Sequence, residues 1–144
     1  MKISTKGRYA LRIMLDLALS DTGKPVRVKD IARRQEISEK YMEQIISVLN
    51  KAGFVRSIRG PQGGYFLARK PSEYTAGMIL RLTEGSMVPV DCLEFEKPGC
   101  TRQSDCATFL LWKRLDEALR GVIDTVTLED LVDWSRKGGH DYSI

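Results

Sequence analysis

Residues 53–68 read GFVRSIRGPQGGYFLA. Two runs of strand-forming residues, Phe54–Arg59 and Tyr65–Ala68, flank the glycine- and proline-rich segment 60–64. Glycine and proline are the residues that tight turns favour, because glycine tolerates positive φ and proline presets the turn geometry. The stretch therefore predicts a β-hairpin, and the segments on either side decide which fold contains it.

Three helical patterns precede the hairpin. Apolar residues crowd residues 6–20, a shorter apolar face runs from Val28 to Arg34, and Ser38 has the character of an N-cap. The third helix is expected to run from Ser38 to about Lys51. The order helix, short helix, helix, hairpin predicts a mostly α-helical winged helix-turn-helix with a small β-hairpin wing.

The second half of the chain is also expected to be helical. Thr75 begins a short helix that Gly85 closes, and residues 86–105 are predicted to form a loop. A long helix follows from about Cys106 to Val126, and residues 127–130 resemble a capping box that opens a last helix. We thus divide the chain into a DNA-binding domain (1–85), a cysteine-bearing loop (86–105), and a long helix with a C-terminal helix and tail (106–144).

An apolar seam runs along the long helix. Its members alternate at spacings of three and four residues: Trp112, Leu115, Leu119, Val122 and Val126. This pattern suits a partner helix, most simply the same helix of a second subunit, and it equally suits a stripe packed in the core of its own subunit. Periodicity leaves both interpretations open.

Charge is divided unevenly. Residues 1–70 contain 15 lysines and arginines against 6 acidic residues, whereas residues 71–144 contain 8 against 13. The basic first half can neutralise phosphates, which indicates a nucleic-acid partner. No apolar run is long enough to span a membrane and no signal-peptide pattern opens the chain, so we expect a cytoplasmic protein without membrane contacts.

The third predicted helix is the one expected to enter the major groove, with its first residues at base edges. That segment offers a cation, hydroxyls, a carboxylate and an amide, which are the groups that read bases. The candidate reading residues are Ser38, Lys40, Tyr41, Glu43 and Gln44. For each residue, the alternative is an ordinary solvated surface position.

Four further residues are candidates for DNA contact. Arg59 and Gly60 lie at the hairpin tip, where a cation fits a narrow, negative minor groove. Lys6 and Arg8 lie at the start of the first helix and are expected to contact phosphates beside the helix N-terminal amides.

Three cysteines, Cys92, Cys100 and Cys106, follow a C-x7-C-x5-C pattern. Clustered thiolates can bind one soft metal or an iron-sulfur cluster, and free or redox-active thiols are the alternative. The chain has no C-x-x-C, no histidine near these cysteines in sequence and no phosphate-binding glycine loop, which argues against an enzyme.

Several motifs resemble one group of bacterial regulators. The opening MKISTKGRYA, SEKYMEQ at 38–44 and GFVRSIRGPQGGY at 53–65 are similar to the IscR, NsrR and CymR type of winged helix-turn-helix transcription regulators, and AGMIL at 76–80 and TLEDL at 127–131 also fit. The resemblance implies a homodimer paired through the long helix on a palindromic double-stranded DNA operator. It also implies that the third helix reads the major groove and the wing the minor groove.

The cysteines look most like those of the iron-sulfur branch of that group. IscR-like members hold a 2Fe-2S cluster, which implies Cys92, Cys100 and Cys106 as ligands. Two features depart from the IscR pattern, because Phe109 stands where a histidine is usual and the first cysteine spacing is longer. The fourth ligand is therefore left open, and a cluster-free thiol- or zinc-sensing regulator, or a regulator of cysteine metabolism like CymR, is the alternative.

Overall fold

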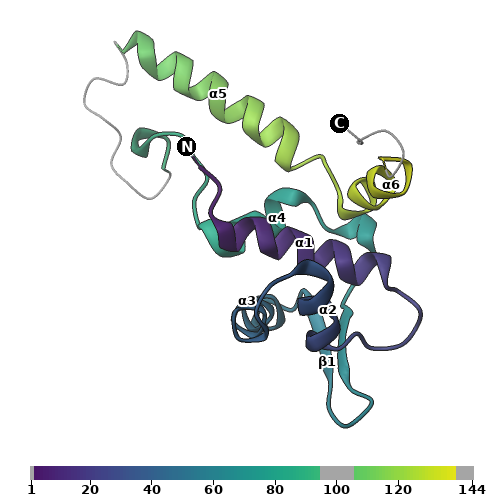
Figure 1. The fold of residues 1–144 in the computed structure, drawn as a ribbon. Coiled ribbons are helices and arrows are strands. Elements are labelled where there is room, and N and C mark those ends of the chain that lie inside the picture. Colours follow the sequence, from purple (N-terminus) through teal and green to yellow (C-terminus); the bar gives the residue numbers. More distant parts are fainter. Residues whose placement is uncertain (1, 95–105, 139–144) are drawn as a thin grey trace.

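The computed structural model describes residues 2–94 and 106–138 (Figure 1). The described elements, in chain order, are α1 (Thr5–Leu19), α2 (Val28–Gln35), α3 (Glu39–Lys51), β1 (Val55–Ile58), β2 (Gly64–Leu67), the 3-10 turn η1 (Pro71–Glu73), α4 (Ala76–Glu84), the 3-10 turn η2 (Asp91–Leu93), α5 (Ala107–Ile123) and α6 (Leu128–Gly138).

Capping side chains fix where the helices begin. The hydroxyl of Ser38 accepts a hydrogen bond from the Tyr41 amide at 3.2 Å, which starts α3 where the sequence predicts it. Thr75 caps α4 in the same way. At α6, Thr127 and Asp130 bond reciprocally to each other's backbone amides at 2.9 and 3.1 Å, which confirms the predicted capping box.

The turn between α2 and α3 is tight. Glu36 ends α2 in the left-handed region, with φ 55° and ψ 45°. The next amide, that of Ile37, then donates to the Ala32 carbonyl at 3.0 Å, and the Ile37 side chain is buried. This closure fixes the angle between the two helices of the helix-turn-helix.

The wing is a two-stranded antiparallel hairpin, whose register pairs Val55 with Leu67 and Ile58 with Gly64. Val26 adds a bridge on the outer side of β2, because it exchanges both backbone hydrogen bonds with Tyr65, at 2.9 and 2.8 Å. A side chain on Gly64 would overlap the backbone of Val26, so glycine is required there. The bridge ties the wing to the segment that enters α2.

Helix α1 lies at the centre of the core. It packs against α2 and α3 on one side and against α4 and α6 on the other (Figure 1). Its apolar residues Ile13 and Met14 are fully buried, as are Ile45 and Leu49 of α3. The predicted fold class, mostly helical with a hairpin wing and a long additional helix, is confirmed.

Helix α5 extends away from this body (Figure 1), and its main contacts among the described residues are with α4 and η2. Its end is attached by a short antiparallel bridge between Thr75 and Thr127. The chain then returns through α6 to α1. Within the described segments, no helix combines the length and apolar character needed to cross a bilayer.

One local expectation differs from the structure. The stretch from residue 86 was expected to be a plain loop, yet it contains the turn η2 next to α5. Leu93 at the end of this turn lines a small cavity with Leu119 and Ile123 of α5, so an apolar anchor shapes the segment. A single anchoring side chain leaves no periodicity in the sequence.

Candidate nucleic-acid interface and cysteine segment

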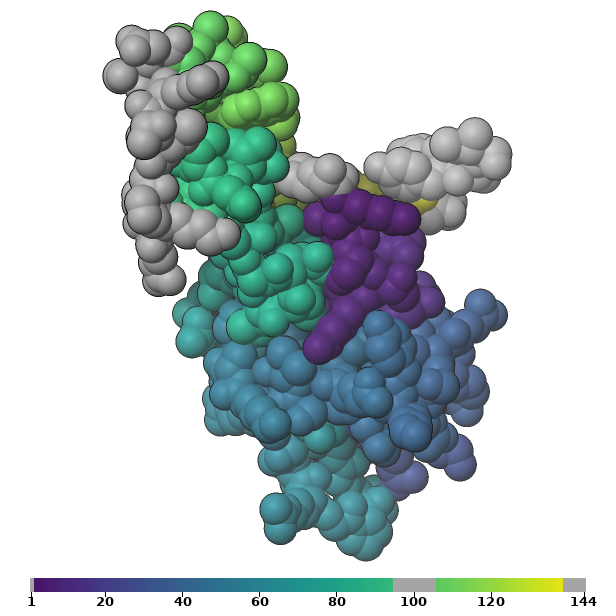
Figure 2. Space-filling model, turned by 90° about the vertical axis from the view of Figure 1, so that its left-hand side faces the viewer, coloured from purple at the N-terminus to yellow at the C-terminus, as the bar shows by residue number. Residues whose placement is uncertain are grey.

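Helix α3 has two distinct faces. Met42, Ile45, Ile46 and Leu49 are buried in the core. The predicted base-reading residues project from the other side: Ser38, Lys40, Glu43 and Gln44 are exposed and Tyr41 is half-buried. Figure 2 views the molecule from the side on which α3 lies in Figure 1, and the wing protrudes below the α2–α3 region. A polar helix face beside a protruding hairpin is the arrangement with which winged helices contact a groove and the adjacent backbone.

Tyr41 is oriented by a chain of contacts that begins on α1. Its ring meets that of Tyr9 edge to face, with centroids 5.8 Å apart, and the Arg12 guanidinium lies 5.1 Å from the Tyr9 ring centre. Arg12 in turn donates to the side chain and the carbonyl of Gln35 at 2.9 and 2.7 Å, and Gln35 donates to Asp16 at 2.9 Å. Arg12, Asp16 and Gln35 were not among the predicted site residues, because their contacts join α1 to the end of α2 and no local pattern contains them.

Asp16 is the buried centre of this network, with 5% of its surface exposed. The Arg34 guanidinium donates two hydrogen bonds to its carboxylate, at 3.0 and 2.7 Å. The hydrogen bond with Asp16 raises the pKa of Arg34. A buried carboxylate with three donors is fully compensated, so the pair fixes α2 against α1.

The wing tip carries Arg59 and Gly60, both exposed as expected. Gly60 has φ 111°, a conformation that favours glycine, and its carbonyl accepts from the Gly63 amide at 2.9 Å. Arg27, immediately before α2, donates to the Pro61 carbonyl at 2.7 Å. This bond holds the tip against the helix-turn-helix, and no sequence signal marked Arg27 beyond its charge.

Lys6 and Arg8 lie in the first turn of α1, half-buried and exposed respectively. The helix start is attached to the end of α4, because the Ser4 hydroxyl and amide donate to the Glu84 carboxylate. The Ser4 hydroxyl is the main reason that the pKa of Glu84 is lowered. The two cations are therefore placed on a fixed helix end.

Two of the three cysteines lie in the described residues. Cys92 is in η2 and Cys106 immediately precedes α5, and both are half-buried free thiols. The Cys106 sulfur lies 3.1 Å from the Thr108 hydroxyl, and this hydrogen bond lowers the pKa of Cys106. A thiol that ionises easily is suited to metal ligation or oxidation. Cys100 lies outside the described residues.

Cys92 and Cys106 come from two different elements, the turn η2 and the residue that precedes α5. Leu93, next to Cys92, lines a cavity with the α5 residues Asp116, Leu119 and Ile123. Among the described residues, histidine, cysteine and carboxylate side chains form no group of three suited to a metal. The thiol chemistry fits an iron-sulfur cluster, and the ligand set stays a prediction.

The apolar seam of α5 is unevenly exposed. Leu115 and Val122 are 43% and 59% exposed, whereas Trp112 and Leu119 are half-buried. The outward face is completed by Leu111, which is 55% exposed and lies one turn before Leu115. The five predicted seam positions lie on one side of the helix, and their partial exposure in a single subunit leaves both interpretations of the seam as predictions.

Comparison with known proteins decides the family. The family model Rrf2, described as "Iron-dependent Transcriptional regulator", matches residues 3–134. The chain belongs to the Rrf2 family. As a member of it, the protein is a DNA-binding transcription regulator and not an enzyme, as the sequence predicted.

Two individual relatives illustrate the match of this Rrf2 protein. The HTH-type transcriptional regulator CymR of Bacillus subtilis (strain 168) is 46% identical over 135 residues, covering 94% of this chain and 92% of the relative. IscR of Aliivibrio salmonicida (strain LFI1238) is 42% identical over 132 residues, covering 92% and 77%. The resemblance to IscR- and CymR-type regulators is thus confirmed.

Solved structures agree with these matches. The structure of CymR, the global cysteine regulator of B. subtilis, superposes with a TM-score of 0.79 at 46% identity, covering 93% of this chain and 98% of that one. A T. potens IscR structure gives a TM-score of 0.74 at 38% identity, covering 100% and 92%. Both relatives share the arrangement of this chain over nearly its whole length.

Proposed function

We propose that two copies of this chain form a homodimer that binds a palindromic DNA operator. The observation that carries the proposal is the pair of exposed surfaces on one subunit. Helix α3 presents a polar face beside the wing, and α5 presents an apolar face formed by Leu111, Leu115 and Val122. Three large apolar side chains in a row on one helix favour a partner helix over solvent.

Within this dimer we assign reading of the major groove to the start of α3. Lys40, Glu43 and Gln44 supply a cation, an acceptor and an amide at its exposed face. We assign Arg59, at the wing tip, to insertion into the minor groove, and Lys6 and Arg8 to phosphate contacts. Tyr41 contributes through its position, which Tyr9 fixes from α1.

We further propose that Cys92, Cys100 and Cys106 hold an iron-sulfur cluster, with the fourth ligand unassigned. When bound, such a cluster supplies a group whose state responds to iron, oxidants or nitric oxide. Support comes from the free thiols Cys92 and Cys106, which lie in the segment between α4 and α5, and from the IscR relatives. Because that segment contacts α5, its arrangement is coupled to the dimer helix and through it to the spacing of the two α3 helices.

A second candidate is a cluster-free regulator of cysteine metabolism that senses through thiols or zinc. It is favoured by the 46% identity to CymR, and by Phe109, which offers no ligand atom in the first turn of α5. The hydrogen bond with Thr108 that lowers the pKa of Cys106 suits direct thiol oxidation as well as it suits ligation. The DNA-binding part of the proposal is the same for both candidates.

DNA recognition is tested by selecting duplexes from a random pool and measuring affinity over a range of salt concentrations. We expect Arg59→Ala to weaken binding and to reduce the salt slope by about one unit, because a phosphate or minor-groove cation is lost. Lys137→Gln, an exposed cation on α6, is the matched control and is expected to change neither. A protein that selects no sequence would contradict the proposal.

The sensing group is tested by anaerobic purification followed by iron and sulfide assays and visible absorption. Wild-type protein is expected to carry iron and sulfide with a thiolate-to-iron band, and Cys92→Ala to lose both. Colourless wild-type protein that stays iron-free after anaerobic reconstitution would exclude the cluster and leave the cysteine-responsive candidate.

A further inference from the structure

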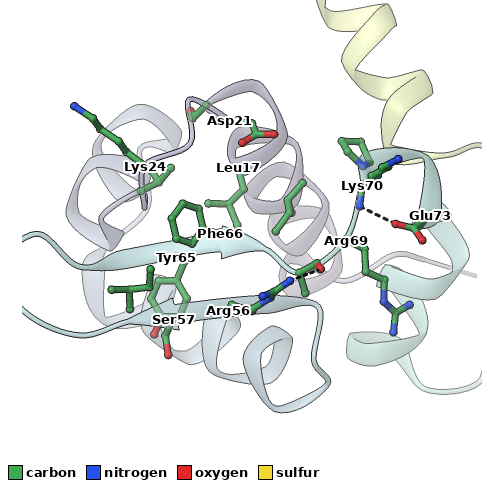
Figure 3. A pocket seen from close by; sticks show the side chains of 16 residues that line it. Leu17, Asp21, Lys24, Arg56, Ser57, Tyr65, Phe66, Arg69, Lys70 and Glu73 are labelled. Carbon is green, nitrogen blue, oxygen red and sulfur yellow. Dashed lines mark hydrogen bonds between the residues drawn. The ribbon is translucent and has the colours of Figure 1, made fainter.

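A cavity of about 690 Å³ opens between the wing and the end of α1 (Figure 3). Its size falls within the range of about 300–1,000 Å³ in which small-molecule sites are found. The wall comes from three parts of the chain, namely the end of α1 with the following turn, the strands of the wing, and the segment from Arg69 through η1. The DNA and cysteine assignments above make no use of this cavity.

The floor of the cavity is apolar. Strand pairing places Phe66 opposite Arg56, so both side chains lie on the same face of the hairpin. Leu67 and Tyr65, on the opposite face, pack against the hydrophobic core, whereas Phe66 does not belong to that core and is only half-buried. Leu17, which is only 2% exposed, and Phe66 both line the cavity, and Ile58 adds a side chain that is 48% exposed. This wing therefore presents apolar surface away from its own core.

The rim of the cavity is mainly cationic. Four basic side chains contribute to it, from Lys24, Arg56, Arg69 and Lys70, against the two carboxylates of Asp21 and Glu73. Figure 3 shows Lys24 on one side of the Phe66 ring and Arg69 and Lys70 on the other. Over the described segments 2–94 and 106–138, none of the four cations forms an ion pair.

Two of the polar groups at the rim have structural partners. The Arg56 guanidinium donates to the Ala68 carbonyl at 3.2 Å, which spans the two strands at the base of the wing. Glu73 accepts from the Lys70 amide at 2.9 Å and so fixes the turn η1. These bonds leave the charges in place, so the rim carries four positive charges against two negative ones and is cationic on balance.

We propose that this cavity binds a small organic anion, a molecule with a flat apolar body and a carboxylate or similar acid group. The body would lie on Phe66 beside Ile58, and the acid group would meet the Arg69 guanidinium at the rim. An aromatic floor with guanidinium groups at its edge suits this combination, because arginine binds planar anions through paired N–H donors.

Occupancy of the cavity bears on DNA binding, and this consequence rests on the proposed function. The occupant would contact both the wing and the end of α1, so it would fix the wing relative to the helix-turn-helix. Arg59 lies at the tip of the same hairpin as Arg56 and Phe66. A ligand that restrains the hairpin therefore changes how the tip meets the minor groove.

The test uses three ligands that share one ring: naphthalene-2-carboxylate, the neutral naphthalene-2-methanol and the cationic naphthalene-2-methylammonium. Each is titrated into isotope-labelled dimer while backbone amide signals are followed. We expect the carboxylate to bind at least about tenfold more tightly than the other two. The shifted signals are expected to be those of Phe66, Leu67 and Ala68.

Variants then locate the binding. Phe66→Ala and Arg69→Gln are each expected to weaken carboxylate binding about tenfold, and Lys137→Gln, a cation on α6 outside the cavity, is expected to leave it unchanged. Equal binding of the three ligands, shifts confined to α5, or no saturable binding at millimolar concentration would overturn the proposal. A folded Arg69→Gln protein is verified by its unchanged amide spectrum away from the cavity.

DNA affinity is measured with and without naphthalene-2-carboxylate as a separate arm. A change in affinity that disappears in Phe66→Ala supports the coupling of the cavity to the wing. If the protein binds no DNA, the proposed function fails while the amide titration still decides the ligand site. If Arg69→Gln weakens DNA binding and the carboxylate does not bind, the rim cations belong to the DNA interface and the cavity is not a ligand site.

Discussion

The Arg81 guanidinium on α4 donates two hydrogen bonds to the Asp124 carboxylate at the end of α5, at 2.5 and 3.0 Å. These hydrogen bonds lower the pKa of Asp124. They join the DNA-binding body to the helix that we assign to the dimer, beside the Thr75–Thr127 bridge. The pair is therefore one of the contacts that set the orientation of α5 relative to the DNA-binding body.

The pair predicts a specific acid dependence of stability. Because the pKa of Asp124 is lower in the folded state, the ionised carboxylate stabilises the fold at any pH above its unfolded pKa of about 3.9. This stabilisation is lost as pH falls through the lower pKa of the folded state. Both side chains are 39% exposed, so the contribution is expected to be only about 0.2–1 kcal/mol. Denaturant unfolding of Asp124→Asn is expected to show that loss at neutral pH and a shallower decline in acid.

Asp133→Asn is the control for this measurement, since Asp133 is exposed on α6 and forms no ion pair in the described part of the chain. It is expected to leave stability at neutral pH unchanged. An identical acid profile for wild type and Asp124→Asn would show that the pair contributes nothing.

Gly77 lies at the same junction, where its neighbours leave no room for a larger side chain. A methyl group there would overlap the Asp124 carboxylate and would lie 3.1 Å from the backbone carbonyl of Ile123. Since a backbone carbonyl cannot turn aside, Gly77→Ala is expected to lower the free energy of unfolding by about 1–3 kcal/mol. Gly121→Ala in α5 meets nothing within 4 Å in its own subunit, and the better helix propensity of alanine is expected to raise stability by up to about 1 kcal/mol. A stabilised Gly77→Ala protein would contradict the close packing.

The buried hydroxyl of Tyr74 forms two hydrogen bonds, and its removal is expected to lower the stability of the fold. This side chain is fully buried, donates to the Phe54 carbonyl at 2.7 Å and accepts from the Arg69 amide at 3.0 Å. Tyr74→Phe leaves both groups without their partner and is expected to cost about 1–3 kcal/mol in thermal or denaturant unfolding. Tyr65→Phe is the control, because the Tyr65 hydroxyl forms no hydrogen bond within residues 2–94 and 106–138. Similar losses for both variants would refute this interpretation.

Burial also raises the pKa of Tyr74. Folding thus favours the neutral phenol, and this effect stabilises the protein fully at any pH below the unfolded pKa of about 10. The stabilisation is lost as pH rises through the higher pKa of the folded state. Wild-type protein is expected to lose stability in alkali more steeply than Tyr74→Phe.

Local signals in the sequence predicted most of the fold. Ser38, Thr75 and Thr127 mark helix starts because capping depends on residues within three positions. The glycine-rich segment 60–64 marked the hairpin for the same reason. The Val26 bridge to Tyr65 and the contact of Tyr9 with Tyr41 join segments more than 30 residues apart, so no local pattern contains them.

The candidate site was predictable to a similar extent. Exposure of Lys40, Glu43 and Gln44 follows from the helical period, since the core positions of α3 fix which face remains. The rim of the cavity was not predictable, because Arg56 and Arg69 meet only through the tertiary arrangement of the wing and η1. The partner of the apolar seam on α5 was not predictable either, because helical periodicity marks an apolar side without saying whether it packs on its own subunit or on another.

The outward face of α5 gives the most direct test of the dimer. Leu115→Asp places a charge at the centre of the row formed by Leu111, Leu115 and Val122, and a charge buried between two helices without a partner is strongly unfavourable. We expect this variant to shift from dimer towards the 16.3 kDa monomer in sedimentation, and to lose affinity for a palindromic operator in parallel. Lys113→Asp introduces the same residue at an exposed position on a different face and is expected to remain dimeric. A Leu115→Asp protein that stays dimeric and binds DNA normally would move the interface elsewhere, whereas a monomer with an unchanged fold would show that this row joins the two subunits.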